Sequence, residues 1–158
     1  RDLPHVTLTF AAGKRDYDRT AANLKGSAAA GCPRVSLLDY IYDMPVRMAA
    51  ADLVVSRAGA MTVSELSLLG KAAVLVPSPY VADNHQLRNA QALVRAGAGV
   101  CVEEDGLPGG ALERAVLPLL AQSAERAAMG QRLQEGFACP DANERLCVEL
   151  LRLARGQA

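Results

Sequence analysis

The sequence has 158 residues, enough for one domain with a buried core. It carries 17 lysines and arginines against 17 aspartates and glutamates, so the basic excess that nucleic-acid binding requires is missing and no such partner is expected. No run approaches the roughly 20 apolar residues of a membrane span, and residues 1–8 do not resemble a signal peptide, so we expect a cytoplasmic chain.

In chain order, short apolar strands alternate with helical patterns. We predict strands at 6–11, 34–38, 52–56, 73–76 and 99–102, and helices at 16–29, 45–51, 62–69 and 85–96. Continuous apolar strands that alternate with helices are typical of a parallel sheet covered on both faces, and the predicted fold class is therefore α/β. The last third is predicted to be helical, with two apolar faces: Leu112, Val116, Leu119 and Leu120, and then Leu146, Leu150 and Leu153.

The four cysteines, at positions 32, 101, 139 and 147, include no CxxC pair, and the chain has only two histidines. A zinc site would need closer ligand spacing, and free cysteines are usually buried as small apolar residues. We therefore expect no metal site, no disulfide and no cofactor.

The segment from Ser56 to Glu65 follows a predicted strand and opens a helix. Its small residues would let a ligand approach the backbone, and a helix N-terminus offers free N–H groups and the positive end of a dipole. Ligands of parallel α/β sheets bind at the carboxyl ends of the strands, so this segment is a candidate diphosphate site. Two roles are open for Glu65: a capping box with Thr62, or a carboxylate that binds ribose hydroxyls.

A second segment, Pro77–Ala90, follows the next predicted strand and again leads into a helix. Asn84, His85, Gln86 and Asn89 gather neutral donors and acceptors at the helix start, as the hydroxyls of a sugar require. The alternative is that Asn84 caps the helix and its neighbours are only solvated surface.

Residues 52–100 closely resemble the donor-binding region of MurG-type glycosyltransferases, with their Arg-Ser/Ala-Gly-Ala-x-Thr-x-x-Glu and Asn-His-Gln-x-x-Asn-Ala signatures. The resemblance runs from about 6 to 103 and continues more loosely to the C-terminus. It implies a Rossmann-like doubly wound parallel sheet, the C-terminal half of a GT-B enzyme that adds N-acetylglucosamine to a lipid-linked peptidoglycan precursor, converting lipid I to lipid II.

The resemblance also implies a donor site for UDP-N-acetylglucosamine. Ile41 would contact uracil through its backbone with Met44 nearby, Glu65 would bind ribose, and Gln86 would read the sugar hydroxyls beside His85 and Asn89. The helix start would face the phosphates. The implied set is Ile41, Met44, Arg57, Gly59, Ala60, Met61, Thr62, Glu65, His85, Gln86 and Asn89.

The chain also departs from the family pattern. It shows no Gly-rich loop after a first strand and no acceptor-binding N-terminal domain, which in the family holds the lipid-linked acceptor, the membrane-facing surface and the proposed catalytic base. We therefore expect a single UDP-sugar-binding domain over 1–158 with no catalytic residue of its own, inactive alone. The full-length protein would be peripheral on the inner face of the membrane. The absent strand would leave a gap of roughly 9–10 Å between the strands at 6–11 and 53–56.

Three other functions remain open from the sequence. UDP-N-acetylglucosamine 2-epimerases share the fold, but they pair two acidic residues where Leu66 follows Glu65 here. A short chain also suits the donor-binding subunit of a two-chain transferase. The third is a non-catalytic module that holds other wall-synthesis proteins.

Overall fold

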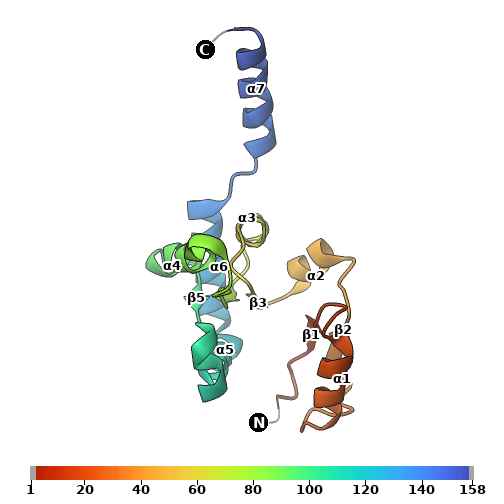
Figure 1. Ribbon diagram of the computed structural model, residues 1–158. Helices are drawn as coiled ribbons and strands as arrows, with labels where there is room; N and C mark the ends of the chain where they lie inside the picture. Colours follow the sequence, from red (N-terminus) through yellow and green to blue (C-terminus); the bar gives the residue numbers. More distant parts are fainter. Residues whose placement is uncertain (1–2, 157–158) are drawn as a thin grey trace. The chain divides into compact units, whose positions relative to one another are not determined.

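The computed structural model describes residues 3–156, which form two compact units that divide between Met44 and Pro45. The first unit holds two strands and one helix, and the second holds the remaining elements (Figure 1). In chain order the elements are β1 (Leu8–Ala11), α1 (Tyr17–Lys25), β2 (Val35–Leu38), α2 (Met44–Ala50), β3 (Val54–Ser56), α3 (Ala60–Leu69), β4 (Ala73–Leu75), η1 (Ala82–Asn84), α4 (His85–Arg95), β5 (Val100–Cys101), η2 (Glu104–Gly109), α5 (Ala111–Ala121), α6 (Ser123–Phe137) and α7 (Ala142–Ala154).

In the first unit, β1 and β2 pair in parallel, with Leu8 opposite Val35 and Ala11 opposite Leu38. Helix α1 joins them as the crossover that a parallel pair requires. None of the described residues of this unit is fully buried, and Leu8 is 49% exposed. Apolar burial within the unit itself is therefore modest.

In the second unit, β3, β4 and β5 form a three-stranded parallel sheet in that order. Val54 lies opposite Ala73, and Val74 lies opposite Val100. Because parallel strands run in the same direction, the carboxyl ends of all three strands meet at one edge of the sheet. The polar segments that follow these strands are thereby brought to that edge.

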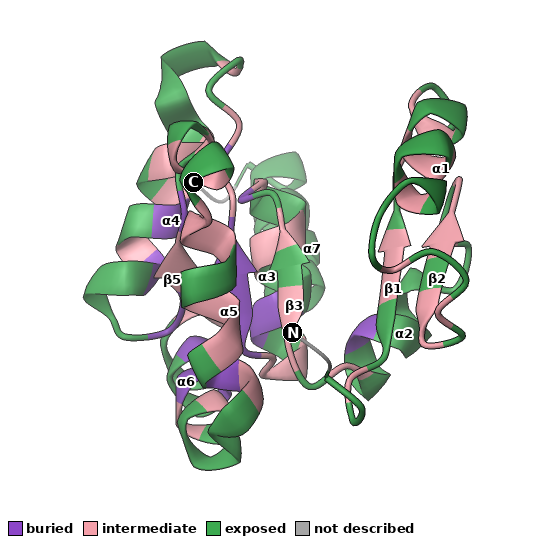
Figure 2. Cartoon of the chain, turned by 90° about the horizontal axis from the view of Figure 1, so that it is seen from below, coloured by how far each residue is buried: buried purple, intermediate pink, exposed green. Residues whose placement is uncertain are grey.

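Strand β4 is buried on both of its faces. Ala73 and Leu75 belong to one apolar cluster with α3, α4 and α6, whereas Val74 belongs to a second cluster with α5 and α6. Side chains of a strand point alternately to opposite faces, so this division places helices on both sides of the sheet. Figure 2 shows the buried residues gathered around these elements. Burial on both faces explains why the strand reads as a continuous apolar run.

Side chains of helix α6 donate hydrogen bonds to carbonyl groups at the C-terminal ends of three other helices. Arg126 donates to the carbonyl oxygens of Leu119 and Leu120 at 2.5 and 2.9 Å, at the end of α5. Arg132 Nε donates to Gly97 O after α4 at 2.6 Å, and Gln134 Nε2 donates to Leu68 O in α3 at 3.2 Å. Cations and donors at helix C-termini satisfy orphan carbonyls and favour the dipole. Through these bonds α6 fixes the helices that carry the site.

The predicted α/β class, with parallel strands flanked by helices, is confirmed. The five strands divide into two sheets, and the predicted width of the gap between residues 6–11 and 53–56 stays a prediction, as does the single-domain interpretation. Of the four residues predicted to share the first apolar face, Leu112, Val116 and Leu119 pack in one cluster, and Leu120 does not belong to it. The second predicted face, on α7, is solvent-exposed: Leu146, Leu150 and Leu153 are 59%, 57% and 57% exposed. Over residues 3–156, none of the helices is long and apolar enough to span a bilayer.

Candidate functional site: the carboxyl edge of the β3–β4–β5 sheet

The start of α3 provides backbone donors that the helix itself does not use. Gly59 is the N-cap residue, with an extended backbone (φ −68°, ψ 150°). The first intrahelical bond runs from Val63 N to Gly59 O at 2.9 Å, so the N–H groups of the first three helical residues have no partner within the helix. No atom would lie within 4 Å of a Cβ added at Gly59. This exposed start, with the positive end of the helix dipole, suits a phosphate group.

The capping-box interpretation of Thr62 and Glu65 is wrong. Helix α3 begins at Ala60, two residues before Thr62, and its N-cap Gly59 offers no side-chain acceptor. Thr62 is therefore already inside the first turn, where it cannot act as the cap. Glu65 is exposed, and across residues 3–156 no hydrogen bond or ion pair engages its carboxylate. The carboxylate remains available to a ligand.

Arg57 bonds to protein groups on both neighbouring segments of the edge. Its Nη1 donates to Val76 O at 3.2 Å, directly after β4, and its Nη2 donates to Glu104 Oε1 at 2.5 Å, after β5. The side chains of Arg57 and Glu104 are 49% and 28% exposed. Both bonds tie the residue just after β3 to the ends of the next two strands.

The loop between β4 and α4 contains two consecutive non-glycine residues with left-handed backbones, Asp83 (φ 53°) and Asn84 (φ 49°). Such residues are uncommon and gather at functional sites. Asn84 occupies the N-cap position of α4 but makes no side-chain hydrogen bond to the helix. The alternative in which Asn84 serves only as a side-chain cap is therefore wrong.

The first turns of α4 present polar groups to the same edge. Gln86 Oε1 accepts from Ser78 N at 2.9 Å, so its amide N–H groups remain for other partners. Asn89 Nδ2 donates to Ala58 O at 2.9 Å, which leaves Asn89 Oδ1 as an acceptor. Both side chains are partly buried and therefore held in place. They connect α4 to the segments after β4 and β3.

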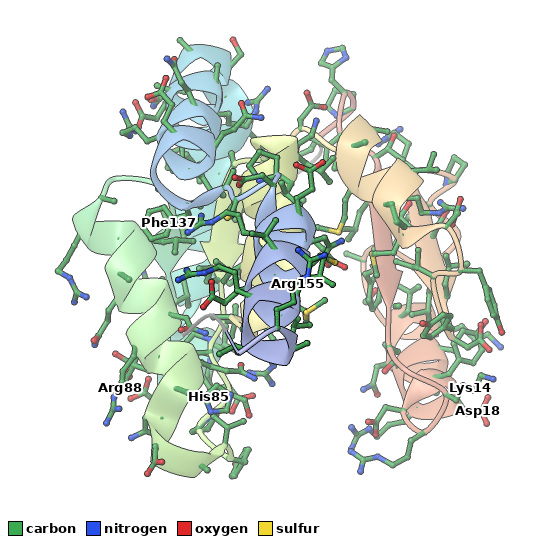
Figure 3. All side chains as sticks on the ribbon, turned by 90° about the horizontal axis from the view of Figure 1, so that it is seen from above. Lys14, Asp18, His85, Arg88, Phe137 and Arg155 are labelled. Carbon is green, nitrogen blue, oxygen red and sulfur yellow. The ribbon has the colours of Figure 1, made fainter. Side chains whose placement is uncertain are left out.

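His85 and Arg88 lie on the solvent-facing side of α4 (Figure 3). The His85 Nδ1 atom lies 2.9 Å from Ala82 O, and because a carbonyl oxygen only accepts, Nδ1 carries the proton. In the neutral ring Nε2 is then an acceptor that a hydroxyl can use. The ring is thus oriented by the loop that precedes its helix.

A cavity of about 280 Å³ lies between the loop after β4 and the segment after β5. Its walls combine prolines with amide, hydroxyl and carboxylate groups, a mixture suited to a polar ligand. The lining residues are Pro77, Ser78, Pro79, Asn84, Leu87, Glu103, Glu104 and Asp105.

Ile41 and Met44 belong to the first unit. Ile41 is half-buried, and Met44 begins α2. The rings of Tyr40 and Tyr42, the sequence neighbours of Ile41, are exposed, and their centroids lie 4.9 Å apart in a T-shaped arrangement. Their assignment to uracil stays a prediction. The other predicted donor residues lie in the second unit.

Three residues at the edge were not singled out from the sequence. Ser56 Oγ, at the end of β3, is buried and lacks a hydrogen-bond partner among residues 3–156. Ser78 N donates a hydrogen bond to Gln86, and Glu104 accepts one from Arg57. The sequence offers two signals for them. One is a serine at the end of an apolar strand, and the other is an acidic run, residues 103–105, directly after another strand.

Cys101 lies on β5, the third strand of this sheet. Burial, and next the nearby charge of Glu103, raises the pKa of the Cys101 thiol on β5. Within residues 3–156, no group of three or more His, Cys, Asp or Glu side chains is placed to hold a metal ion. The carboxyl edge of the sheet presents hydrogen-bond donors and acceptors that a polar ligand could use.

The model of the glycosyltransferase family 28 C-terminal domain matches residues 3–146. The chain belongs to this family. Relatives named UDP-N-acetylglucosamine--N-acetylmuramyl-(pentapeptide) pyrophosphoryl-undecaprenol N-acetylglucosamine transferase include one from Salinibacter ruber, 42% identical over 149 residues, and one from Exiguobacterium sp., 41% identical over 145 residues. The alignments cover 94% and 92% of this chain but 38% of each relative. The chain therefore spans about two fifths of their length.

A solved structure agrees with this membership of the family 28 C-terminal domain. Acinetobacter baumannii MurG superposes with a TM-score of 0.79 at 29% identity, covering 92% of this chain and 42% of that one. The glycosyltransferase of kitacinnamycin, at 19% identity and a TM-score of 0.60, shares the fold. The resemblance to MurG-type transferases and the predicted class, the C-terminal half of a GT-B fold, are both confirmed.

Proposed function

We propose that this chain is the donor-binding domain of an N-acetylglucosaminyltransferase and that it binds UDP-N-acetylglucosamine at the carboxyl edge of the β3–β4–β5 sheet. The observation that carries the proposal is the exposed start of α3, with free backbone donors after Gly59 and the unpaired carboxylate of Glu65 one turn beyond Thr62. One end of α3 thus presents donors for a diphosphate and an acceptor for hydroxyl groups.

Each chemical part of the donor has a matching group. The diphosphate would lie against the N–H groups of Ala60, Met61 and Thr62, and the ribose hydroxyls would donate to Glu65. The free amide N–H groups of Gln86 and the Oδ1 atom of Asn89 would read the sugar, with His85 Nε2 beside them. Uracil would meet the backbone of Ile41 near Met44.

The same helix start would assist the transfer step. When the bond between the sugar and UDP breaks, negative charge develops on the departing diphosphate. Preorganised N–H donors and a helix dipole aimed at that charge stabilise the transition state without reorganisation. The contribution of this chain would therefore be leaving-group stabilisation and donor orientation.

The acceptor would be the lipid-linked muramyl pentapeptide that the relatives' names describe. We assign deprotonation of the acceptor hydroxyl to the acceptor-binding domain that the family resemblance implies. The complete enzyme would convert lipid I to lipid II while bound peripherally to the inner face of the cell membrane, and this chain alone would be inactive.

The proposal is tested in the full-length natural protein with UDP-N-acetylglucosamine, labelled in the sugar, and a muramyl-pentapeptide acceptor. We expect label to pass to the acceptor and UDP to be released in equal amount. Conversion of the donor to a UDP-sugar epimer in the absence of acceptor would instead support the epimerase alternative.

A further inference from the structure

Three segments follow the carboxyl ends of β3, β4 and β5, and side chains tie them together. Arg57 reaches from the end of β3 to Val76 O after β4 and to Glu104 after β5, at 3.2 and 2.5 Å. Two of these three groups belong to positions that the family resemblance did not assign. The family resemblance places Arg57 in the donor site without giving it a particular role.

The residue after Arg57 is fixed from the opposite side. Ala58 is fully buried, and its carbonyl oxygen accepts from Asn89 Nδ2 at 2.9 Å. Gly59, the next residue, is the N-cap of α3. A Cβ added to Gly59 would have no atom within 4 Å. The direction of the unpaired N–H groups at the start of α3 therefore depends on how firmly the two residues before Gly59 are held.

We propose that Glu104 is a positioning residue of the donor site: acting through Arg57, it holds the segment that leads into α3 against the ends of β4 and β5. Glu104 also lines the cavity between the loop after β4 and the segment after β5, and the proposal assigns it no direct contact with the donor. The proposal rests on the proposed function for its ligand, but its structural content, a Glu104-dependent α3 start, can be measured without any ligand.

The proposed role of Glu104 depends on its negative charge as well as on the volume of its side chain. The guanidinium of Arg57 is a planar fork whose two ends here meet a carbonyl and a carboxylate, and a charge-assisted bond is stronger than a neutral one. Replacing the carboxylate with an amide of the same shape removes the attraction but not the volume. The Glu104→Gln variant therefore isolates the contribution of charge to the bond between Arg57 and Glu104.

The first arm measures binding by calorimetry in the full-length natural protein. We expect Glu104→Gln to raise the Kd of UDP-N-acetylglucosamine and that of UDP by the same factor, about twofold to fivefold, as befits one partly exposed ion pair. In transfer assays the KM for the donor should rise. Arg57→Gln should have a similar effect, and the double variant should bind no worse than the weaker single variant.

The matched control is Glu125→Gln. Glu125 pairs with Arg132 at 3.1 Å with comparable exposure of the two side chains, 49% and 42%, but Arg132 holds Gly97, which precedes β5 at the amino edge of the sheet. Its loss should leave donor affinity unchanged. Unchanged affinity in Glu104→Gln, tighter binding, or losses that multiply in the double variant would overturn the proposal.

The second arm needs no ligand. Hydrogen–deuterium exchange of residues 57–66 and 76–80 in the unliganded protein should be faster in Glu104→Gln than in wild type, and unchanged in Glu125→Gln. If the wild-type protein fails to bind UDP-N-acetylglucosamine, the proposed function fails, and this arm still decides the role of Glu104. Exchange that is identical in Glu104→Gln and wild type overturns the role of Glu104.

Discussion

The side-chain amide of Asn89 on α4 donates a hydrogen bond of 2.9 Å to the backbone carbonyl of Ala58, 31 residues earlier in the chain. Ala58 is fully buried, so its carbonyl oxygen has no access to water as a substitute partner. Two signature motifs of the donor site are therefore joined by one bond, and each depends on the other for its position.

Replacing Asn89 with Asp should lower the free energy of unfolding by about 1–3 kcal/mol, because Asp keeps the shape but cannot donate to the buried carbonyl. Urea unfolding measures the change. Arg88→Ala, at the exposed neighbouring position on the same helix, is the control and should shift stability by less than about 0.5 kcal/mol. Equal stability of Asn89→Asp and wild type would show that the bond contributes nothing.

Gln86 has two functions that two substitutions can separate. Gln86→Glu keeps an acceptor for Ser78 N but loses the amide donors proposed for the sugar, whereas Gln86→Ala loses both. We expect Gln86→Glu to reduce discrimination among UDP-sugars and Gln86→Ala to destabilise the loop after β4 as well. Competition binding with several UDP-sugars measures the first effect, and exchange at Ser78 measures the second. Equal losses for UDP and UDP-N-acetylglucosamine in Gln86→Glu would place the side chain away from the sugar.

Gly130 marks the point where α6 crosses the end of α3. A Cβ at this position would overlap the carbonyl oxygen of Gly70. Gly70 is the C-cap residue of α3 and has a left-handed backbone (φ 59°). Gly130→Ala should therefore cost about 1–3 kcal/mol of stability or more. Gly136 lies on the same helix with nothing within 4 Å, and Gly136→Ala should instead stabilise by about 0.5–1 kcal/mol through helix propensity. Thermal unfolding of both variants should move their midpoints in opposite directions.

The alkylation of Cys101 should depend on pH in a way that burial explains. Burial, with the charge of Glu103 as a second cause, raises the pKa of this thiol, and only the thiolate reacts. The midpoint of its alkylation profile should therefore lie at higher pH in the folded protein than in the urea-unfolded chain. Mass spectrometry of iodoacetamide-labelled peptides measures both profiles. A folded midpoint at or below the unfolded one would contradict this assignment.

The sequence predicted the positions of all five strands because each is a short apolar run bounded by polar or small residues, as in Ala73–Leu75. The predicted strands were longer than the observed ones by one or two residues. Val76 and Val102, for example, lie just outside the strand bounds although each still donates to a carbonyl of the neighbouring strand. Helix α6 was not separated from its neighbours. Met129, Leu133 and Phe137 pack into the core at helical spacing, but the bonds from α6 to the carbonyls of Leu68, Gly97 and Leu119 cannot be predicted from local patterns.

Prediction of the site was limited by geometry that spacing does not encode. Thr62 matched a capping pattern, but the helix begins two residues earlier because Gly59 adopts the extended N-cap conformation. The bond between Arg57 and Glu104 joins residues 47 positions apart, a distance over which local patterns carry no information. Residues 57–65 and 84–89 lie after the carboxyl ends of the parallel strands β3 and β4, as the alternating pattern predicted, while their roles in donor binding stay predictions.

The most direct test of the donor site is a calorimetric comparison of UDP-N-acetylglucosamine binding to the full-length protein and to its Glu65→Ala variant. Glu65 is exposed and makes no bond to residues 3–156, so its removal should leave the unfolding midpoint unchanged, as should Ser64→Ala at the exposed position beside it. We expect Glu65→Ala to weaken donor binding by about 1.5–3 kcal/mol, the range for a hydrogen bond to a charged group, while Ser64→Ala binds normally. Donor affinity equal to wild type in Glu65→Ala would contradict the donor site described for α3.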